Sequence, residues 1–268
     1  MQQLRHELKQ ILIDRNPQTI RQVFYQMVSH GHIQKTEGEY DNVVVRLLTE
    51  MREEEDIPWS WIIDGTRWPR KPRTYSSIED AIDWCAKTYR RALWDDQGEY
   101  VEVWCEKDAL SGILYPITSE YDVPLLVVKG FSSVTFLHEA AEAIDDTGKP
   151  AFIYYFGDHD SYGRGISADV DTKLGQYAPD AEIHFELIAI NEEQIAKYDL
   201  PTRPDKMDRK PAVELDALPV DVLEDLVRSS IEQHIDSRKL KITKRAEARE
   251  RETLQMMPFG KKQRRQRR

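Results

Sequence analysis

From residue 99 onward, short apolar runs alternate with segments of helical periodicity. The runs LLVV (125–128) and FIYYF (152–156) are almost continuously apolar, which is typical of strands buried on both faces of a sheet. Strands that alternate with helices through short connections form a parallel sheet. The sequence therefore predicts an α/β domain over residues 99–200.

The first 66 residues have a different pattern, with no apolar run of this kind. Helical periodicity covers 4–13, 19–29 and 42–55, and an extended segment, WSWIID, follows at 59–64. This order is typical of a winged helix-turn-helix, although any small helical bundle shares it.

Three further segments complete the predicted organisation. Residues 67–98 form a linker, rich in Pro and Arg, and a helix over 77–93. Residues 201–237 form a C-terminal helical segment with a helix over 221–235, and residues 238–268 form a helical basic tail.

Charge is distributed unevenly along the 268 residues. The net charge is -10, but residues 238–268 carry 13 Lys and Arg against 3 Asp and Glu. Such a tail fits either a polyanion-binding appendage or a solvated terminal helix with a disordered end. The basic residues proposed for phosphate contact are Arg67, Arg70, Lys71 and Arg73 in the linker, and Lys261, Lys262, Arg264 and Arg265 in the tail.

The sequence also argues against a membrane protein and against a secreted protein. No apolar run approaches the ~20 residues of a membrane span, and the start of the chain lacks a signal-peptide pattern. Two cysteines, Cys85 and Cys105, cannot build a disulfide framework. We expect a cytoplasmic protein, associated with the nucleoid if the source is prokaryotic, and no membrane partner.

Three carboxylates stand where predicted strands end. Glu106 follows the first strand of the α/β domain, and Asp158 and Asp160 follow the third. Ligand sites in open parallel sheets lie at the carboxyl ends of strands, and residues two apart on an extended chain share a face. Carboxylate oxygens suit Mg²⁺, so these three are the candidate metal ligands. The alternative is that each acid only caps the helix after its strand.

The order of these residues resembles a TOPRIM domain, the fold found in topoisomerases, primases and certain nucleases. A strand-end Glu106 followed by Lys107, a strand-end Gly130 and then GDHDSYG at 157–163 carry the resemblance. It implies Mg²⁺-dependent phosphodiester chemistry. In it Glu106 is a metal ligand or acid/base, Asp158 and Asp160 are metal ligands, and Lys107 is either a phosphate contact or a solvated lysine.

A tyrosine on the second predicted helix is the candidate nucleophile. Arg21 and Tyr25 are four residues apart and so share a helix face. A tyrosine hydroxyl can attack a phosphodiester, and a neighbouring arginine can grip the phosphate and stabilise its developing charge. Taken alone, this spacing is weak evidence, because most such tyrosines are core or surface residues.

The order of all these parts resembles the topoisomerase VI A subunit and the meiotic double-strand-break transesterase. Arg21 and Tyr25 match that family's R-x-x-[FI]-Y motif, and VELDALP (213–219) is similar to its segment after the last TOPRIM strand, which places Glu214 and Asp216 near the site. Ser161 stands where the family usually has Pro, and the chain resembles a compact stand-alone relative.

The resemblance implies a reaction and its partners. Tyr25, Arg21 and Glu106 would cleave double-stranded DNA through a 5′-phosphotyrosyl intermediate. The enzyme would be a homodimer in which the tyrosine of one protomer faces the metal site of the other. A separate ATPase subunit, not encoded in this chain, is a further expectation.

Two other functions remain open at this point. The chain could be a TOPRIM nuclease that hydrolyses DNA or RNA with metal-activated water, in which Tyr25 is only structural. It could also be a non-catalytic DNA-binding module of a mobile element.

Overall fold

The computed structural model describes residues 1–63, 72–130 and 132–256. Contacts divide the chain into two compact units. The sheet unit comprises Met1–Arg67 and Gly98–His234, and the helix-pair unit comprises Trp68–Gln97 and Ile235–Arg268. None of the helices in the described ranges combines the length and the apolar character needed to cross a membrane.

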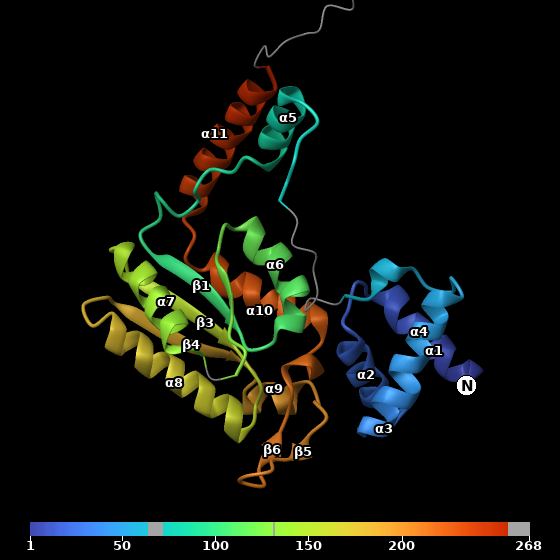
Figure 1. The fold of residues 1–268 in the computed structure, drawn as a ribbon. Helices are drawn as coiled ribbons and strands as arrows, with labels where there is room; N and C mark the ends of the chain where they lie inside the picture. Colours follow the sequence, from blue (N-terminus) through green and yellow to red (C-terminus); the bar gives the residue numbers. More distant parts are fainter. Residues whose placement is uncertain (64–71, 131, 257–268) are drawn as a thin grey trace, which may run out of the picture. The chain divides into compact units, whose positions relative to one another are not determined.

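A four-stranded, fully parallel sheet lies at the centre of the sheet unit (Figure 1). The strand order is β2-β1-β3-β4. The strands are β1 (Tyr100–Cys105), β2 (Leu125–Val127), β3 (Ala151–Phe156) and β4 (Ile183–Ala189). The predicted α/β class and the parallel sheet are confirmed, and the register places Cys105 beside Phe156, so β1 and β3 end together.

Helices cover both faces of this sheet (Figure 1). Two pairs of helices pack on each other, α7 with α8 and α6 with α10. Their bounds are α6 (Ser111–Glu120), α7 (Val134–Asp146), α8 (Ser161–Tyr177) and α10 (Val220–Glu232). A helix follows each of β1, β2 and β3, because parallel strands need a crossover connection. The helix returns the chain to the edge of the sheet at which every strand begins.

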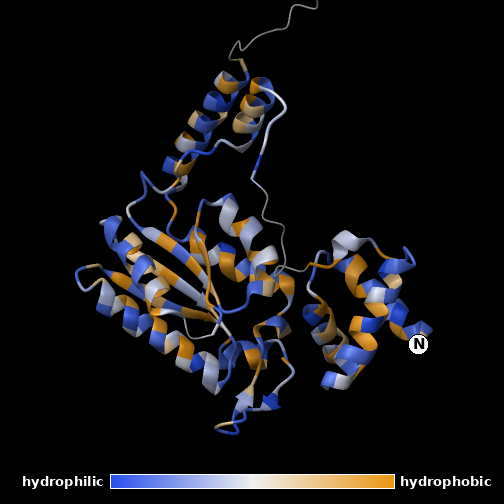
Figure 2. Ribbon diagram, viewed as in Figure 1, coloured by the Kyte–Doolittle hydropathy of each residue, from blue (hydrophilic) through white to orange (hydrophobic). Residues whose placement is uncertain are grey.

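The core explains the apolar runs. Ile153 and Tyr155 of β3 pack with Trp104 of β1 against α7 and α8, and neighbouring residues on each strand point to the opposite face. Figure 2 shows hydrophobic residues along β1 and β3. Trp104 and Tyr155 on this face, and Val103 and Phe156 on the other, are fully buried, so the strands that carry the carboxylates are anchored on both faces.

Smaller elements complete the carboxyl edge of the sheet. A two-stranded antiparallel ladder and several short helical segments follow or connect the strands. They are η3 (Asp108–Leu110), α9 (Glu192–Lys197), β5 (Arg203–Pro204), β6 (Pro211–Ala212) and η4 (Leu215–Ala217).

The N-terminal part of the sheet unit is helical, as predicted. Its elements are α1 (Gln2–Asp14), α2 (Ile20–Ser29), α3 (Glu37–Glu39), η1 (Tyr40–Val45), α4 (Arg46–Glu53) and the turn η2 (Trp59–Trp61). A capping box starts α2, in which the Thr19 hydroxyl accepts a hydrogen bond from the Gln22 amide at 3.1 Å and Gln22 Oε1 accepts one from the Thr19 amide at 2.9 Å.

Three predicted boundaries in the helical regions were wrong. The WSWIID segment, predicted to be extended, begins with the 3₁₀ turn η2, and Ile62 makes a β-bridge to Gln18. The third helical stretch begins at Glu37 because Thr36 caps it by accepting from the Glu39 amide. The helix predicted over 77–93 ends at Thr88, where Tyr89 turns extended.

The helix-pair unit joins two segments that the sequence analysis treated separately. Helices α5 (Ile78–Thr88) and α11 (Ser237–Met256) pack on each other. The Tyr89 hydroxyl donates to Glu250 at 2.8 Å, and the Arg91 amide donates to Glu247 at 3.0 Å. Two acidic residues of α11 thus bind the segment after α5, although α11 as a whole has a positive formal charge.

Candidate active site at the carboxyl edge of the sheet

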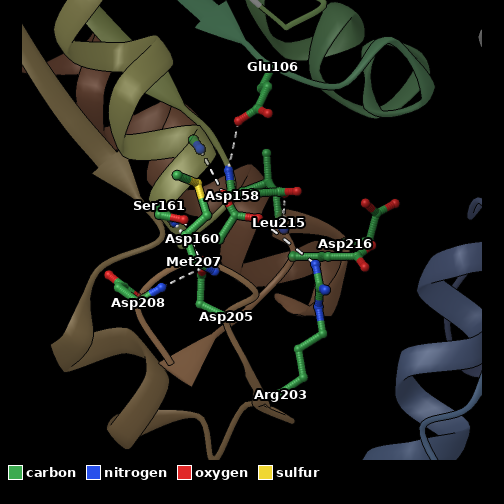
Figure 3. A network of polar contacts seen from close by, with 12 residues as sticks. Glu106, Asp158, Asp160, Ser161, Arg203, Asp205, Met207, Asp208, Leu215 and Asp216 are labelled. Atoms are coloured by element: carbon green, nitrogen blue, oxygen red, sulfur yellow. Dashed lines mark hydrogen bonds and ion pairs between the residues drawn. The ribbon is translucent and has the colours of Figure 1, made fainter. Parts of the chain in front are cut away.

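The ends of β1 and β3 bring Glu106 and Asp158 into direct contact. The Glu106 amide donates to the Phe156 carbonyl at 2.9 Å, which extends the ladder by one step. The Asp158 amide then donates to Glu106 Oε2 at 3.0 Å (Figure 3). The sequence prediction that these strand-end acids lie together is therefore confirmed for this pair.

Asp158 and Asp160 have different partners. Asp158 Oδ1 accepts from the Leu215 amide at 2.8 Å and lies 3.1 Å from Lys107 Nζ. Asp160 Oδ1 accepts from the Gly163 amide at 2.7 Å and so caps α8. The helix-capping alternative therefore holds for Asp160.

Two glycines leave room beside the Glu106 carboxylate. A Cβ on Gly157 would lie 2.9 Å from Glu106 Oε2, and one on Gly163 would lie 3.3 Å from the same oxygen. The Gly163 Cβ would also meet the Asp158 carbonyl oxygen at 2.3 Å. A side chain at either position would therefore crowd Glu106, and one at Gly163 would also displace the backbone of Asp158.

The type of donor atom and the space beside the Glu106 carboxylate both suit Mg²⁺. Glu106, Asp158 and Asp160 supply hard oxygen atoms, and Mg²⁺ needs only one or two carboxylates because it keeps several waters. In the described ranges, however, no three His, Cys, Asp or Glu side chains are gathered closely enough to hold a metal. The three acids thus have the donor atoms of a Mg²⁺ site but are not gathered closely around one position.

Burial and a neighbouring negative charge make Glu106 a weaker acid. Desolvation, with the Asp158 charge second, raises the pKa of Glu106 from 4.5 to about 7. Its carboxyl binds a proton in the folded protein at a pH where the unfolded chain has lost it. This contribution to stability is present below pH 4.5 and is lost as the pH rises to about 7.

Replacing Glu106 by glutamine should therefore stabilise the metal-free protein at pH 8. Glutamine keeps an oxygen to accept the Asp158 amide but carries no charge to bury. We expect the free energy of unfolding to rise by about 1–2 kcal/mol at pH 8, after allowance for partial solvent screening, and to change little near pH 5. Urea unfolding at the two pH values checks this, and a variant that is less stable at pH 8 contradicts it.

Lys107 is the centre of an ion cluster. Its Nζ lies 2.7 Å from Asp216 Oδ2, 3.1 Å from Asp158 Oδ1 and 3.2 Å from Glu214 Oε2. These charges raise the pKa of Lys107 despite its burial, so it stays protonated. The predicted alternative of a solvated lysine is wrong, because the side chain is only 19% exposed and is held by three acids. The expectation that Glu214 and Asp216 lie near the site is confirmed.

The same cluster reaches the candidate nucleophile. Tyr25 makes a side-chain hydrogen bond to Glu214 of its own chain, and Arg21 Nε lies 3.3 Å from Glu214 Oε2. Tyr25 is 2% exposed. Burial raises its pKa, and the charge of Glu214 raises it further. Arg21 and Tyr25 thus share one face of α2, as predicted, and that face meets Glu214.

Lys35 flanks Tyr25 from another side. Its Nζ lies 5.0 Å from the centroid of the tyrosine ring and donates to the Pro201 carbonyl at 2.7 Å. Burial lowers the pKa of Lys35 to about 8. The sequence analysis missed this residue, because a lone lysine in a predicted loop carries no local signal.

Asp205 fixes the start of α8 and was also missed. Its carboxylate accepts from the Ser161 amide and hydroxyl, each at 2.7 Å, and from the Met207 amide at 2.7 Å (Figure 3). These bonds hold the pKa of Asp205 well below its usual range. Ser161, at the position that usually holds Pro in the resembling family, thus supplies two donors that proline lacks.

The predicted phosphate contacts have separate outcomes. Arg67, Arg70, Lys71, Lys261, Lys262, Arg264 and Arg265 lie outside the described residues. Arg73 stacks over Trp84 within the helix-pair unit, with Cζ 3.2 Å from the ring centroid. Cys105 is buried, as expected for a core residue.

A cleft of about 880 Å³ opens beside the cluster. Its lining includes the basic side chains Arg21, Arg52, Lys107 and Lys129 and the acids Asp108, Glu214 and Asp216. Arg21 lies over the ring of Tyr40, another lining residue, at 4.8 Å from the centroid. The cleft therefore brings solvent to the ion cluster and offers cations to an anionic ligand.

No protein-family model, curated protein or solved structure matches this chain.

Proposed function

We propose that the protein cleaves double-stranded DNA by transesterification, with Tyr25 as the nucleophile. One observation supports this above the others: Tyr25, Arg21 and Lys107 share the carboxylate of Glu214. Lys107 in turn contacts Asp158, which contacts Glu106. The candidate nucleophile and the strand-end acids therefore belong to one connected cluster within a single chain, whereas the resemblance implied a tyrosine that faces the metal site of the other protomer.

In the proposed reaction the Tyr25 oxygen attacks the phosphorus and the bond from phosphorus to the 3′ oxygen breaks. The phenolic proton passes to solvent, and the 3′ oxygen takes up a proton to leave as a 3′-hydroxyl. Arg21 provides a cation to the non-bridging oxygens. The product is a 5′-phosphotyrosyl link, and reversal of the same steps reseals the strand.

Glu106, Asp158 and Asp160 would hold Mg²⁺, which when bound supplies positive charge beside the phosphate. Burial raises the pKa of Asp158, and Lys107 opposes this shift and holds the carboxylate in place, because its ammonium lies 3.1 Å from Oδ1. Asp160 fixes the first turn of α8 and thereby the loop that carries both aspartates.

The finer assignments belong to the same proposal. The parallel sheet with acids after β1 and β3 is consistent with a TOPRIM domain, and the helices of residues 1–63 with a winged helix-turn-helix. Together they favour a topoisomerase VI A-like subunit that acts as a homodimer on DNA. Two copies would cut both strands, because a two-fold dimer matches the two-fold axis of a duplex.

Covalent trapping tests this proposal. End-labelled duplex is incubated with the protein and Mg²⁺, quenched with detergent and resolved by electrophoresis. We expect a labelled protein band that falls at least 1,000-fold with Tyr25→Phe, because phenylalanine has no oxygen to form the link. Tyr115→Phe is the matched control, since Tyr115 is 61% exposed on α6, away from the cluster.

Metal-dependent hydrolysis is the second candidate, and the burial of Tyr25 favours it. Tyr25 is 2% exposed and its hydroxyl is hydrogen-bonded to Glu214, so the hydroxyl must be released before it can attack. A Tyr25→Phe protein that still cuts DNA at the wild-type rate, with no protein-linked product, would select hydrolysis by water.

A further inference from the structure

We propose that Glu214 is a positioning residue that holds the Tyr25 hydroxyl in the DNA-free protein, and that a DNA phosphate releases it by competing for Arg21 and Lys107. This inference rests on the proposed transesterase function. It adds that the nucleophile is restrained until substrate is bound.

The contacts of Glu214 define the restraint. Its carboxylate accepts the Tyr25 hydrogen bond and lies 3.3 Å from Arg21 Nε and 3.2 Å from Lys107 Nζ. Its side chain is 17% exposed. Helix α2 and the segment η4 contact each other beside it, so the hydroxyl is fixed between two elements distant in sequence.

Glu214 does not act as a base in this state. An ordinary tyrosine has a pKa of about 10 and an ordinary glutamate about 4.3, so the proton stays on the phenol by more than five orders of magnitude. The two cations lower the pKa of Glu214, and the Glu214 charge raises that of Tyr25, so both shifts widen the gap. The hydrogen bond therefore stabilises the neutral, unreactive phenol.

A phosphodiester can undo this arrangement. Arg21 and Lys107 line the cleft together with Glu214, whereas the lining does not include Tyr25. Guanidinium and ammonium groups bind phosphate oxygens strongly, so a phosphate placed there competes with Glu214 for both cations. Its negative charge also repels the Glu214 carboxylate, and the contact with Tyr25 weakens.

Burial and three charged groups set the titration of Tyr25, and burial has the largest effect. Glu214 raises its pKa, while Lys107 and Arg21 lower it. Lys35 Nζ also lies over the Tyr25 ring, 5.0 Å from its centroid. Removing the Glu214 charge therefore leaves cations as the nearest charged groups, and the phenol becomes easier to ionise.

The test measures the pKa of Tyr25 by NMR in the full chain labelled with ¹³C at tyrosine Cζ, without Mg²⁺. We expect Glu214→Gln to lower this pKa by more than one unit, and to raise the covalent adduct at pH 7.5 at least threefold when Mg²⁺ is added. Glu224→Gln is the matched control, because Glu224 pairs with Arg15 outside the cluster. It should leave both readouts unchanged.

A second measurement needs no variant. Titrating the wild-type protein with a short DNA duplex, without Mg²⁺, should lower the pKa of Tyr25 in the same direction. The same duplex should have less effect on Glu214→Gln, because the restraint is already gone.

The outcomes separate this inference from the proposed function. If Glu214→Gln and the duplex both lower the pKa but no adduct forms in any protein, the transesterase proposal fails and the restraint stands. The restraint is overturned if the pKa does not move in either measurement. It is also overturned if the pKa falls while the adduct of Glu214→Gln decreases, because Glu214 would then assist the reaction.

Discussion

Lys107→Met is expected to lower the free energy of unfolding by about 3–5 kcal/mol at pH 8, because it leaves three acids without their shared cation. The Lys107 side chain is only 19% exposed, and that of Asp216 is 1% exposed. Methionine fills a similar volume, so the loss reports charge rather than a cavity. Chemical unfolding measures it.

The pH dependence of this loss has a definite sign. Lys107 lowers the pKa values of Asp158 and Glu214, so without it both values rise in the folded protein. Groups with raised pKa values destabilise the fold as the pH increases, so the loss should be smaller at pH 5 than at pH 8. Lys129→Met is the control, since Lys129 is 68% exposed and its pair with Asp108 contributes little. If Lys107→Met lowers the free energy of unfolding by less than about 1 kcal/mol at both pH values, the prediction that Lys107 stabilises the fold through its three acids is wrong.

Gly163→Ala should both lower the free energy of unfolding and displace the acids of the site. The new Cβ would lie 2.3 Å from the Asp158 carbonyl oxygen and 3.3 Å from Glu106 Oε2, and the first of these contacts is with backbone that must move. We expect a loss of about 1–3 kcal/mol in unfolding free energy. Displacement of the two acids should reduce DNA cleavage by about 100-fold.

Gly175 provides the matched control on the same helix. Nothing lies within 4 Å of a Cβ built there, so Gly175→Ala removes a flexible residue from α8 without a clash. It should raise the unfolding free energy by up to about 1 kcal/mol and leave cleavage unchanged. If both glycine variants behave alike, close packing at Gly163 is not what constrains the site.

The fold of the sheet was predictable because its signal is local. Strands β2 and β3 lie in almost continuous apolar runs, and Glu106 and Asp158 follow closely after the ends of β1 and β3. Glu106 and Asp158 could be placed together on this basis alone, since parallel strands end at the same edge. Helix boundaries near Thr36 and Tyr89 were less predictable, because a cap or a tertiary contact decided them.

The connections of the site could be predicted only in part. The VELDALP resemblance placed Glu214 and Asp216 nearby, but their joint hold on Lys107 depends on folding across more than 100 residues. Asp205 gave no signal, because it reaches Ser161 from a separate hairpin. The Tyr25 contact with Glu214 likewise joins two segments distant in sequence.

One backbone pairing connects these segments mechanically. His159, between the two aspartates, exchanges both of its backbone hydrogen bonds with Val213, at 2.8 and 3.0 Å. Val213 immediately precedes Glu214. The loop of Asp158 and Asp160 is therefore hydrogen-bonded to the loop that is proposed to restrain Tyr25. We expect a ligand that moves one of these loops to move the other, so that the position of the proposed nucleophile depends on the position of the acids.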